Sequence, residues 1–364
     1  MSTYSIAGIN ILLKPIHKDY FSMTLEPYKS NGPFDYAITS KLVDVIKPID
    51  MTPIMHEKYR FFYEVDGVSI MQVKHQSGLI KYELRTSKDY KTQALFFVKD
   101  LIKDMESIEY ILYSMSFLEV AMREGFLPIH ASSLVLNDEV ILFSAPSKTG
   151  KSTHVRYYQE VFPHAFNLND DKPLIKDGYV YGTPFSGKSK HNLNAKYPLK
   201  ALCFIKQGDT TSISRLSKDE STIYLLKNML RPSQESIWDK MIPIMNEVLT
   251  VDTYLAYLTN EQKSVFTTYH GFYREKIMKL KDGFKLKEIG SKIMVLPTDN
   301  EALNFNGIMT LNQSGKVLFE ALESDQTIDS LVTILTNRYE ISEEEALKDV
   351  VLFIETLKKH NVLL

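Results

Sequence analysis

The sequence predicts an α/β (α+β) protein in three parts: a strand-rich lobe over residues 1–103, a central domain over 104–273 and a small domain over 282–364. Three observations lead to this prediction. Alternating apolar residues on both sides of Asp66-Gly67 are typical of a β-hairpin. An apolar run at 140–143 enters a short loop that a helix-compatible segment follows. The last part of the chain shows strand-like segments first and helix-like segments afterwards.

Composition limits the classes of function. The 364 residues are 44% hydrophobic and 24% charged, which is ordinary for a globular protein. A net charge of −2 gives no basic field for nucleic acid. The single Cys203 excludes an internal disulfide framework, fits a reducing cytoplasm, and lies in an apolar strand-like run as a core thiol. No apolar run reaches the length of a membrane span, and the N-terminus lacks the order of a signal peptide. We therefore expect a cytoplasmic protein that binds neither nucleic acid nor a membrane, while formation of a homo-oligomer stays open.

The N-terminal lobe carries strand signals but no obvious chemistry. We predict a hairpin over 61–73 and a further strand over 79–84. Helical periodicity then predicts a helix over 105–123. The apolar positions expected to form its buried stripe are Ile108, Ile111, Leu112, Met115, Leu118 and Met122.

The most informative stretch for function is 139–162. Strands at 133–136 and 139–143 form a predicted hairpin, and the second strand leads into a loop that ends in Gly150-Lys151-Ser152. This is the sequence form of a phosphate-binding P-loop, with Ala145 in the place of the usual first glycine. Loop N–H groups and the helix N-terminus would face phosphate oxygens, Lys151 would reach the β- and γ-phosphates, and the Ser152 hydroxyl would bind Mg²⁺. The residues predicted to bind ATP are Ala145, Pro146, Ser147, Lys148, Thr149, Gly150, Lys151, Ser152 and Thr153.

A second stretch, 182–189, fits the same pattern and keeps the first glycine. The residues after it make a poor helix start, and Pro198 follows soon afterwards. Without a helix, no helix N-terminus would face the phosphates. We interpret 182–189 as a flexible loop near the site.

Two adjacent carboxylates are the next catalytic candidates. Asp170 and Asp171 follow a predicted short strand at 166–169, where P-loop enzymes place a Mg²⁺-binding carboxylate. One of them would hold the metal with Ser152, and the other would accept a proton from an attacking hydroxyl. Asp171 is the candidate metal ligand, while the division of the two roles between Asp170 and Asp171 stays open. A solvated turn is the alternative reading of the same residues. His130, at the start of the hairpin, would contact the phosphoryl group or orient the acid pair, although a lone histidine is more often structural.

The rest of the central and C-terminal parts is predicted as follows. A hairpin turns at Asp177-Gly178, a strand covers 199–205, and 217–258 is mainly helical. A linker at 274–283 leads to strands at 284–289, 292–296 and 307–311 and helices at 312–323, 327–338 and 342–360. The last helix has a capping box formed by Ser342 and Glu345. Its expected buried stripe is Leu347, Val350, Val351, Ile354 and Leu357.

The stretch Ile129–Val135, the P-loop and the acid pair together resemble the catalytic core of HPr kinase/phosphorylase-like proteins, whose fold is similar to the phosphoenolpyruvate carboxykinase core. The resemblance covers about residues 105–260. It implies kinase chemistry in which one aspartate is the general base and the pair also serves Mg²⁺. The matching residues are His130, Lys151, Ser152, Asp170 and Asp171. Ala145 and Lys148 stand where the family has glycine, so the resemblance gives no support for the reverse phosphorylase reaction.

The C-terminal domain resembles the PqqD-like precursor-recognition element of ribosomal peptide biosynthesis, a winged-helix-like domain. The resemblance rests on Phe305-Asn306-Gly307, on 311–319, on Leu357 and on 362–364. Such domains bind a leader peptide as an added strand against the last helix. A winged-helix-like accessory domain without a ligand is the alternative reading.

The two resemblances together imply a kinase that phosphorylates a Ser or Thr hydroxyl of a ribosomally synthesised precursor peptide, similar to the kinases that tailor lasso-type peptides. Leader capture would raise the effective concentration of the acceptor at the kinase site. Two alternatives stay open. One is a kinase of a small hydroxyl compound such as free serine or a sugar, and the other is a non-catalytic ATP-binding scaffold that delivers the peptide.

Overall fold

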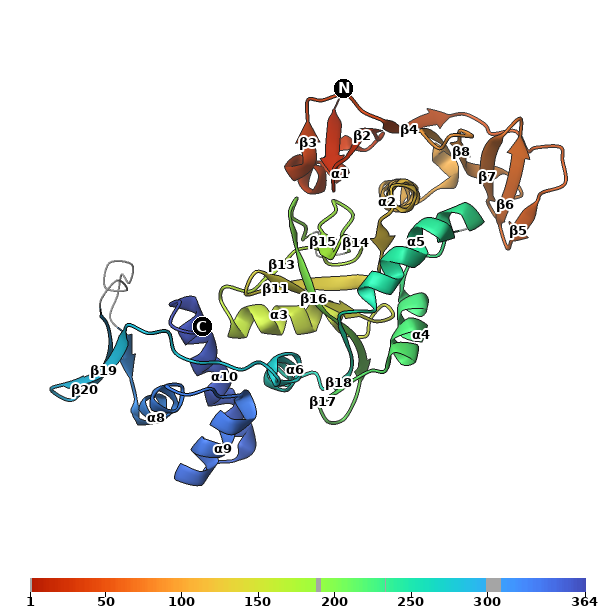
Figure 1. The fold of residues 1–364 in the computed structure, drawn as a ribbon. Coiled ribbons are helices and arrows are strands. Elements are labelled where there is room, and N and C mark those ends of the chain that lie inside the picture. The colour runs from red at the N-terminus through yellow and green to blue at the C-terminus, as the bar shows by residue number, and fades with distance from the viewer. Residues whose placement is uncertain (1, 188–190, 233, 299–308) are drawn as a thin grey trace. The chain divides into compact units, whose positions relative to one another are not determined.

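The computed structural model describes residues 2–187, 191–232, 234–298 and 309–364 (Figure 1). The chain forms two compact units. The first comprises Met1–Gln159, Pro163–Ile205 and Arg215–Leu255, and the second comprises Glu160–Phe162, Lys206–Ser214 and Ala256–Leu364. The architecture is a mixture of helices and several sheets, as the sequence predicts. None of the helices in the described ranges is long and apolar enough to cross a membrane.

The N-terminal part of the first unit is a nine-stranded sheet. The predicted hairpin is confirmed, with Val65 opposite Val68 and a turn in which Asp66 and Gly67 both have positive φ, as a two-residue hairpin turn requires. The strands, in sheet order, are β3 (Lys29–Ser30), β1 (Thr3–Ile6), β2 (Ile9–Lys14), β4 (Tyr36–Val43), β9 (Thr92–Val98), β8 (Ile80–Thr86), β7 (Val68–Lys74), β6 (Arg60–Val65) and β5 (Met55–Glu57).

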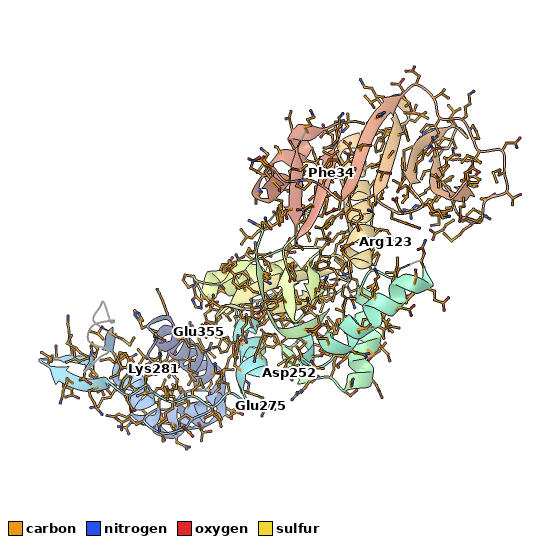
Figure 2. The ribbon with its side chains drawn as sticks, turned by 45° about the horizontal axis from the view of Figure 1, so that its top comes forward. Phe34, Arg123, Asp252, Glu275, Lys281 and Glu355 are labelled. Atoms are coloured by element: carbon orange, nitrogen blue, oxygen red, sulfur yellow. The ribbon has the colours of Figure 1, made fainter. Side chains whose placement is uncertain are left out.

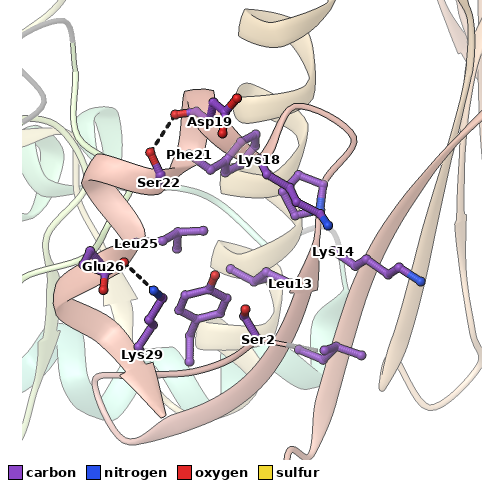
Figure 3. A pocket seen from close by; sticks show the side chains of 13 residues that line it. Ser2, Leu13, Lys14, Lys18, Asp19, Phe21, Ser22, Leu25, Glu26 and Lys29 are labelled. Carbon is purple, nitrogen blue, oxygen red and sulfur yellow. Dashed lines mark hydrogen bonds and ion pairs between the residues drawn. The ribbon is translucent and has the colours of Figure 1, made fainter. Parts of the chain in front are cut away.

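A pocket of about 360 Å³ lies beside β2 and the helix α1 (Lys18–Leu25), in the lobe for which the sequence predicts no chemistry (Figure 3). Its walls include the apolar side chains of Leu13, Phe21 and Leu25. Charged residues lie at its rim, where the Lys29 ammonium pairs with the Glu26 carboxylate.

The helix α2 spans Met105–Arg123, as predicted, but its buried face differs from the predicted stripe. Ile111 and Met115 are 58% and 43% exposed, whereas Tyr113 and Phe117 are fully buried. The buried face also carries Glu109, whose carboxylate accepts hydrogen bonds from the backbone N–H groups of residues 16 and 17. Apolar residues lie on both the buried and the exposed side of this helix, so their positions alone do not identify the buried face.

The second sheet contains the strand that leads into the predicted P-loop. The strand β12 (Glu139–Ser144) pairs antiparallel with β11 (Ala131–Leu136) and parallel with β16 (Lys196–Gln207), so it is an interior strand. The full order is β10-β14-β15-β16-β12-β11-β13, and β18 also joins β16 and β17. The remaining strands are β10 (Leu127–Pro128), β14 (Leu174–Lys176), β15 (Tyr179–Tyr181), β13 (Phe166–Asn167), β17 (Ser212–Arg215) and β18 (Asp252–Leu258).

Three helices accompany this sheet: α3 (Lys151–Val161), α4 (Lys218–Asn228) and α5 (Glu235–Val248). The predicted hairpin at Asp177-Gly178 is confirmed by β14 and β15. The prediction of a helix through 258 is wrong for its last residues, because 252–258 is the strand β18. Its threonine and two tyrosines are residue types that are enriched in strands.

The C-terminal unit contains the predicted strands β19 (Phe284–Ile289), β20 (Lys292–Pro297) and β21 (Met309–Leu311). The helices that follow are α8 (Gln313–Ala321), α9 (Ile328–Arg338) and α10 (Glu343–Lys359). The capping box of Ser342 and Glu345 is confirmed. The predicted stripe is buried except at the half-buried Leu347. The predicted motif Phe305-Asn306-Gly307 lies outside the described residues.

The predicted linker at 274–283 is a packed part of this unit. Met278 exchanges two backbone hydrogen bonds with Gln326, and Leu280 donates one to Leu322. Both Met278 and Leu280 are buried. The helix α6 (Ser264–Tyr273) precedes this segment and contacts α10. The unit therefore begins well before the predicted domain boundary at residue 282.

Candidate functional site

The candidate site begins where β12 ends and α3 starts. The loop 145–150 joins these two elements, and α3 begins at Lys151. The Lys151 ammonium lies over the loop, where it donates hydrogen bonds to the carbonyl oxygens of Ala145 (2.8 Å) and Pro146 (3.3 Å). The Thr149 hydroxyl also donates to the Pro146 carbonyl. The loop is therefore closed around its own lysine.

Two residues of the loop have left-handed backbone conformations. Gly150 has a φ of +111°, a region that residues with a Cβ rarely adopt. Lys148 has a φ of +69°, so a lysine occupies a backbone conformation that glycine adopts without strain.

The helix α3 is anchored by its buried face. Val155 and Tyr158 are fully buried, and the His154 ring lies edge-on to the rings of Phe143 and Tyr158. Burial lowers the pKa of His154 to about 3, so its imidazole is neutral at physiological pH. This packing fixes the N-terminus of α3 at the end of β12, where the first helical turn meets the loop and the His154 N–H donates to the Gly150 carbonyl.

Asp170 and Ser152 are linked through a buried serine of β11. The Ser132 hydroxyl donates a hydrogen bond of 2.8 Å to Oδ1 of Asp170, and its oxygen lies 3.4 Å from the Ser152 hydroxyl oxygen. Ser132 is fully buried, and Asp170 is 5% exposed. The Asn167 amide lies 3.5 Å from the same carboxylate oxygen. The structure thus brings Asp170 close to the start of α3.

Asp171 faces a different set of partners. Its carboxylate lies 3.1 Å from Nε2 of His130 and pairs with the Lys172 ammonium. Burial by itself would raise the pKa of Asp171, but the hydrogen bond from His130 and the charge of Lys172 outweigh burial and lower it to about 2. Burial lowers the pKa of Lys151, and the charges of Asp171 and Asp170 oppose that shift. Five of the predicted site residues therefore lie in one connected cluster: His130, Lys151, Ser152, Asp170 and Asp171.

The side chain of Asn169 holds the turn that contains the two aspartates. Asn169 is not among the residues predicted from the sequence to belong to the site. Its side-chain oxygen accepts hydrogen bonds from the backbone N–H groups of Asp171 (3.0 Å) and Lys172 (2.7 Å). Its amide donates to the carbonyl of Thr183. The run Asn-Asp-Asp-Lys-Pro already carries the signal of such a side-chain-capped turn. The residues that form this turn therefore include both aspartates of the candidate site.

The first part of the second P-loop-like stretch lies against this turn. A Cβ on Gly187 would lie 3.5 Å from Cβ of Asp171, so this glycine packs beside the acid pair, as the interpretation of a loop near the site predicts. The described residues 182–186 are buried, and the Tyr110 hydroxyl of α2 donates to the carbonyl of Pro184 (2.7 Å). The predicted flexibility therefore does not describe these residues. Residues 188 and 189 of the pattern lie outside the described ranges.

Comparison with known protein families gives a match at the C-terminus. Residues 281–363 match the family described as coenzyme PQQ synthesis protein D (PqqD). No curated protein matches the chain. The family match confirms the PqqD-like part of the resemblance, and the kinase part stays a prediction. The matched residues form the three-stranded sheet and the helices α8 to α10. The chain therefore ends in a PqqD domain, the type of domain that recognises the leader of ribosomally synthesised precursor peptides.

Proposed function

We propose that this protein is an ATP-dependent kinase of a Ser or Thr hydroxyl in a ribosomally synthesised precursor peptide, which its PqqD domain captures by the leader. One observation carries the proposal. The same chain combines a PqqD domain with a β12–loop–α3 segment whose Ser152 is connected to Asp170 through Ser132 of the neighbouring strand β11. A domain that only recognises peptides does not need the second feature.

The residues at the start of α3 fit ATP and Mg²⁺ in their chemistry. A hydroxyl and a carboxylate, from Ser152 and Asp170, are the hard oxygen ligands that Mg²⁺ prefers. A helix N-terminus beside an ammonium group suits phosphate oxygens. Bound Mg²⁺ supplies neutralisation of the charge on the phosphoryl oxygens.

Lys151, Asp170 and Asp171 would each have a separate role in the reaction. Lys151 would exchange its hydrogen bonds with the carbonyls of Ala145 and Pro146 for bonds to phosphate oxygens. Ser132 links Asp170 to Ser152 by its two contacts. We therefore assign Mg²⁺ binding to Asp170, whereas the sequence suggested Asp171. Asp171 would then accept the proton of the acceptor hydroxyl.

The state of Asp171 suits an acceptor of protons. Its lowered pKa, about 2, keeps the carboxylate ionised at physiological pH. The hydrogen bond from His130 fixes the orientation of that carboxylate. A carboxylate of such low pKa is a weak base, so positioning and charge neutralisation would supply most of the rate enhancement, as in other phosphoryl transfers.

The test is mass spectrometry of a precursor peptide encoded beside the gene, after incubation with ATP and Mg²⁺. We expect the wild type to add one phosphate to a Ser or Thr outside the leader. Lys151→Ala should abolish this mass gain, and Lys227→Ala, a matched change at an exposed lysine of α4, should not. Asp170→Asn and Asp171→Asn should lose transfer but keep peptide binding.

Other outcomes favour the alternatives. A peptide that binds but stays unmodified while ATP remains intact would favour the ATP-binding scaffold. ATP turnover with free serine or a sugar, without binding of the peptide, would favour a kinase of small hydroxyl compounds.

A further inference from the structure

We infer that Ser132 is a positioning residue that orients the Ser152 hydroxyl for Mg²⁺, through a directed chain of hydrogen bonds from Ser152 to Ser132 to Asp170. The inference rests on the proposed function and deepens it. Ser132 would touch neither the nucleotide nor the metal, and would act only through Ser152 and Asp170.

The direction of these hydrogen bonds follows from the bond between Ser132 and Asp170. The Ser132 hydroxyl donates a hydrogen bond to Oδ1 of Asp170 at 2.8 Å. A serine hydroxyl carries a single proton, so this bond uses the only proton that Ser132 can donate. The oxygen of Ser132 therefore presents only lone pairs to any other neighbour.

Ser152 is that other neighbour, with its hydroxyl oxygen 3.4 Å away. This distance exceeds the usual range for a hydrogen bond between hydroxyls, and such bonds often shorten when a site is loaded. With its proton directed toward Ser132, the Ser152 oxygen keeps both lone pairs for other contacts. A metal ligand must offer a lone pair, so this orientation is the one that Mg²⁺ requires.

The neighbouring serine shows that a buried hydroxyl on this strand is not by itself part of the chain. Ser133 is also fully buried on β11, but its side chain points to the opposite face of the sheet. Within the part of the chain that the structure describes, its hydroxyl has no hydrogen-bond partner. Ser133→Ala is therefore a matched control for Ser132→Ala: both remove one oxygen from a fully buried serine of the same strand.

The experiment is calorimetric titration of ATP into the full-length protein, with Mg²⁺ and with excess chelator. For Ser132→Ala we expect the affinity for Mg·ATP to fall about tenfold, the scale of one lost hydrogen bond to a charged group. The affinity for metal-free ATP should not change. Ser133→Ala should match the wild type in both titrations. Ser132→Cys, which keeps the shape of the side chain with a larger atom and a weaker donor, should lie between the wild type and Ser132→Ala.

Each outcome decides the inference. Equal loss of affinity with and without Mg²⁺ would mean that Ser132 supports the loop as a whole and not the metal ligand, which overturns the inference. If Ser132→Ala and Ser133→Ala both bind Mg·ATP as tightly as the wild type, the inference is wrong while the proposed function stands. If the wild type itself fails to bind Mg·ATP, both are overturned. If Ser132→Ala does not fold, the same comparison is made with Ser132→Cys.

Discussion

His154 links the stability of the first unit to pH. Its buried ring has a pKa of about 3, whereas an unfolded chain has a histidine pKa near 6.5. Between these values the unfolded state binds more protons than the folded state, so stability falls as the pH drops from about 6.5 toward 3. Relative to His154→Gln, the wild type should lose up to about 1.4 kcal/mol of unfolding free energy per pH unit in this window. Urea unfolding at several pH values measures the difference, and parallel curves for the two proteins would contradict it.

The two left-handed residues of the loop give a second prediction at the residue scale. A Cβ at Gly150 would meet no atom within 4 Å, so any cost of Gly150→Ala comes from the backbone conformation alone. We expect this change to cost about 1–3 kcal/mol. Lys148→Gly should stabilise the fold, because glycine adopts a φ of +69° without strain, whereas Lys148→Ala should leave stability near that of the wild type. Chemical unfolding of the three variants tests this order, and a stabilising effect of Lys148→Ala equal to that of Lys148→Gly would refute it.

Some residues of the candidate site can be identified from the sequence, whereas others are identified only from the structure. Lys151 and Ser152 belong to a local motif, and Asp170 and Asp171 follow it at a readable spacing. Ser132 lies in an apolar strand and carries no sequence signal, because its importance depends on two partners that come from other elements. The assignment of different partners to the two aspartates also depends on the fold, since His130 meets Asp171 and not Asp170.

At the scale of elements, the second P-loop-like stretch has its first glycine, Gly182, for a packing reason. A Cβ on this glycine would lie 2.0 Å from the carbonyl oxygen of Leu193, so the glycine is needed for close backbone approach. Because the obstacle is backbone, it cannot rotate away. We expect Gly182→Ala to destabilise the fold by about 3 kcal/mol or more. Gly187→Ala is the control, since its Cβ would make only ordinary contacts of 3.5 Å and longer. Thermal denaturation compares the two, and equal melting temperatures would contradict the explanation.

Helix α2 shows what an element's sequence pattern can and cannot predict. Its periodicity predicts its bounds correctly, because 3.6-residue spacing is a local property. Its buried face is mispredicted because apolar residues lie on more than one side of the helix, with Tyr113 and Phe117 buried and Ile111 and Met115 exposed. Glu109 is buried with partners in residues 16 and 17, more than ninety positions earlier in the chain, and only the folded chain brings these partners together.

At the scale of the whole molecule, the PqqD match does not mark a structural boundary. Glu355, labelled in Figure 2, lies on α10 in the second unit and is buried. Its carboxylate accepts hydrogen bonds from the Tyr269 hydroxyl of α6 and from the Lys358 ammonium. Tyr269→Phe would leave this carboxylate with one donor fewer, at a cost of about 1–3 kcal/mol. Tyr257→Phe, at a partly exposed tyrosine of the same unit, should cost little. Chemical unfolding of both variants measures the difference, and equal stabilities would show that the Tyr269 hydroxyl does not contribute.

This packing also decides how leader dependence should be tested. Deletion of 282–364 would remove Glu355 from α6 and the partners of Met278 and Leu280, so lost activity could reflect lost stability. The intact chain with a synthetic leader peptide added separately is the cleaner test. If the PqqD domain delivers the acceptor, the free leader should compete with the full precursor and inhibit its phosphorylation. A precursor without its leader should react with a much higher KM, because a short flexible tether supplies an effective concentration of about 1 mM. A kinase of small hydroxyl compounds would be unaffected by the free leader, because its acceptor would not bind to the PqqD domain at residues 281–363.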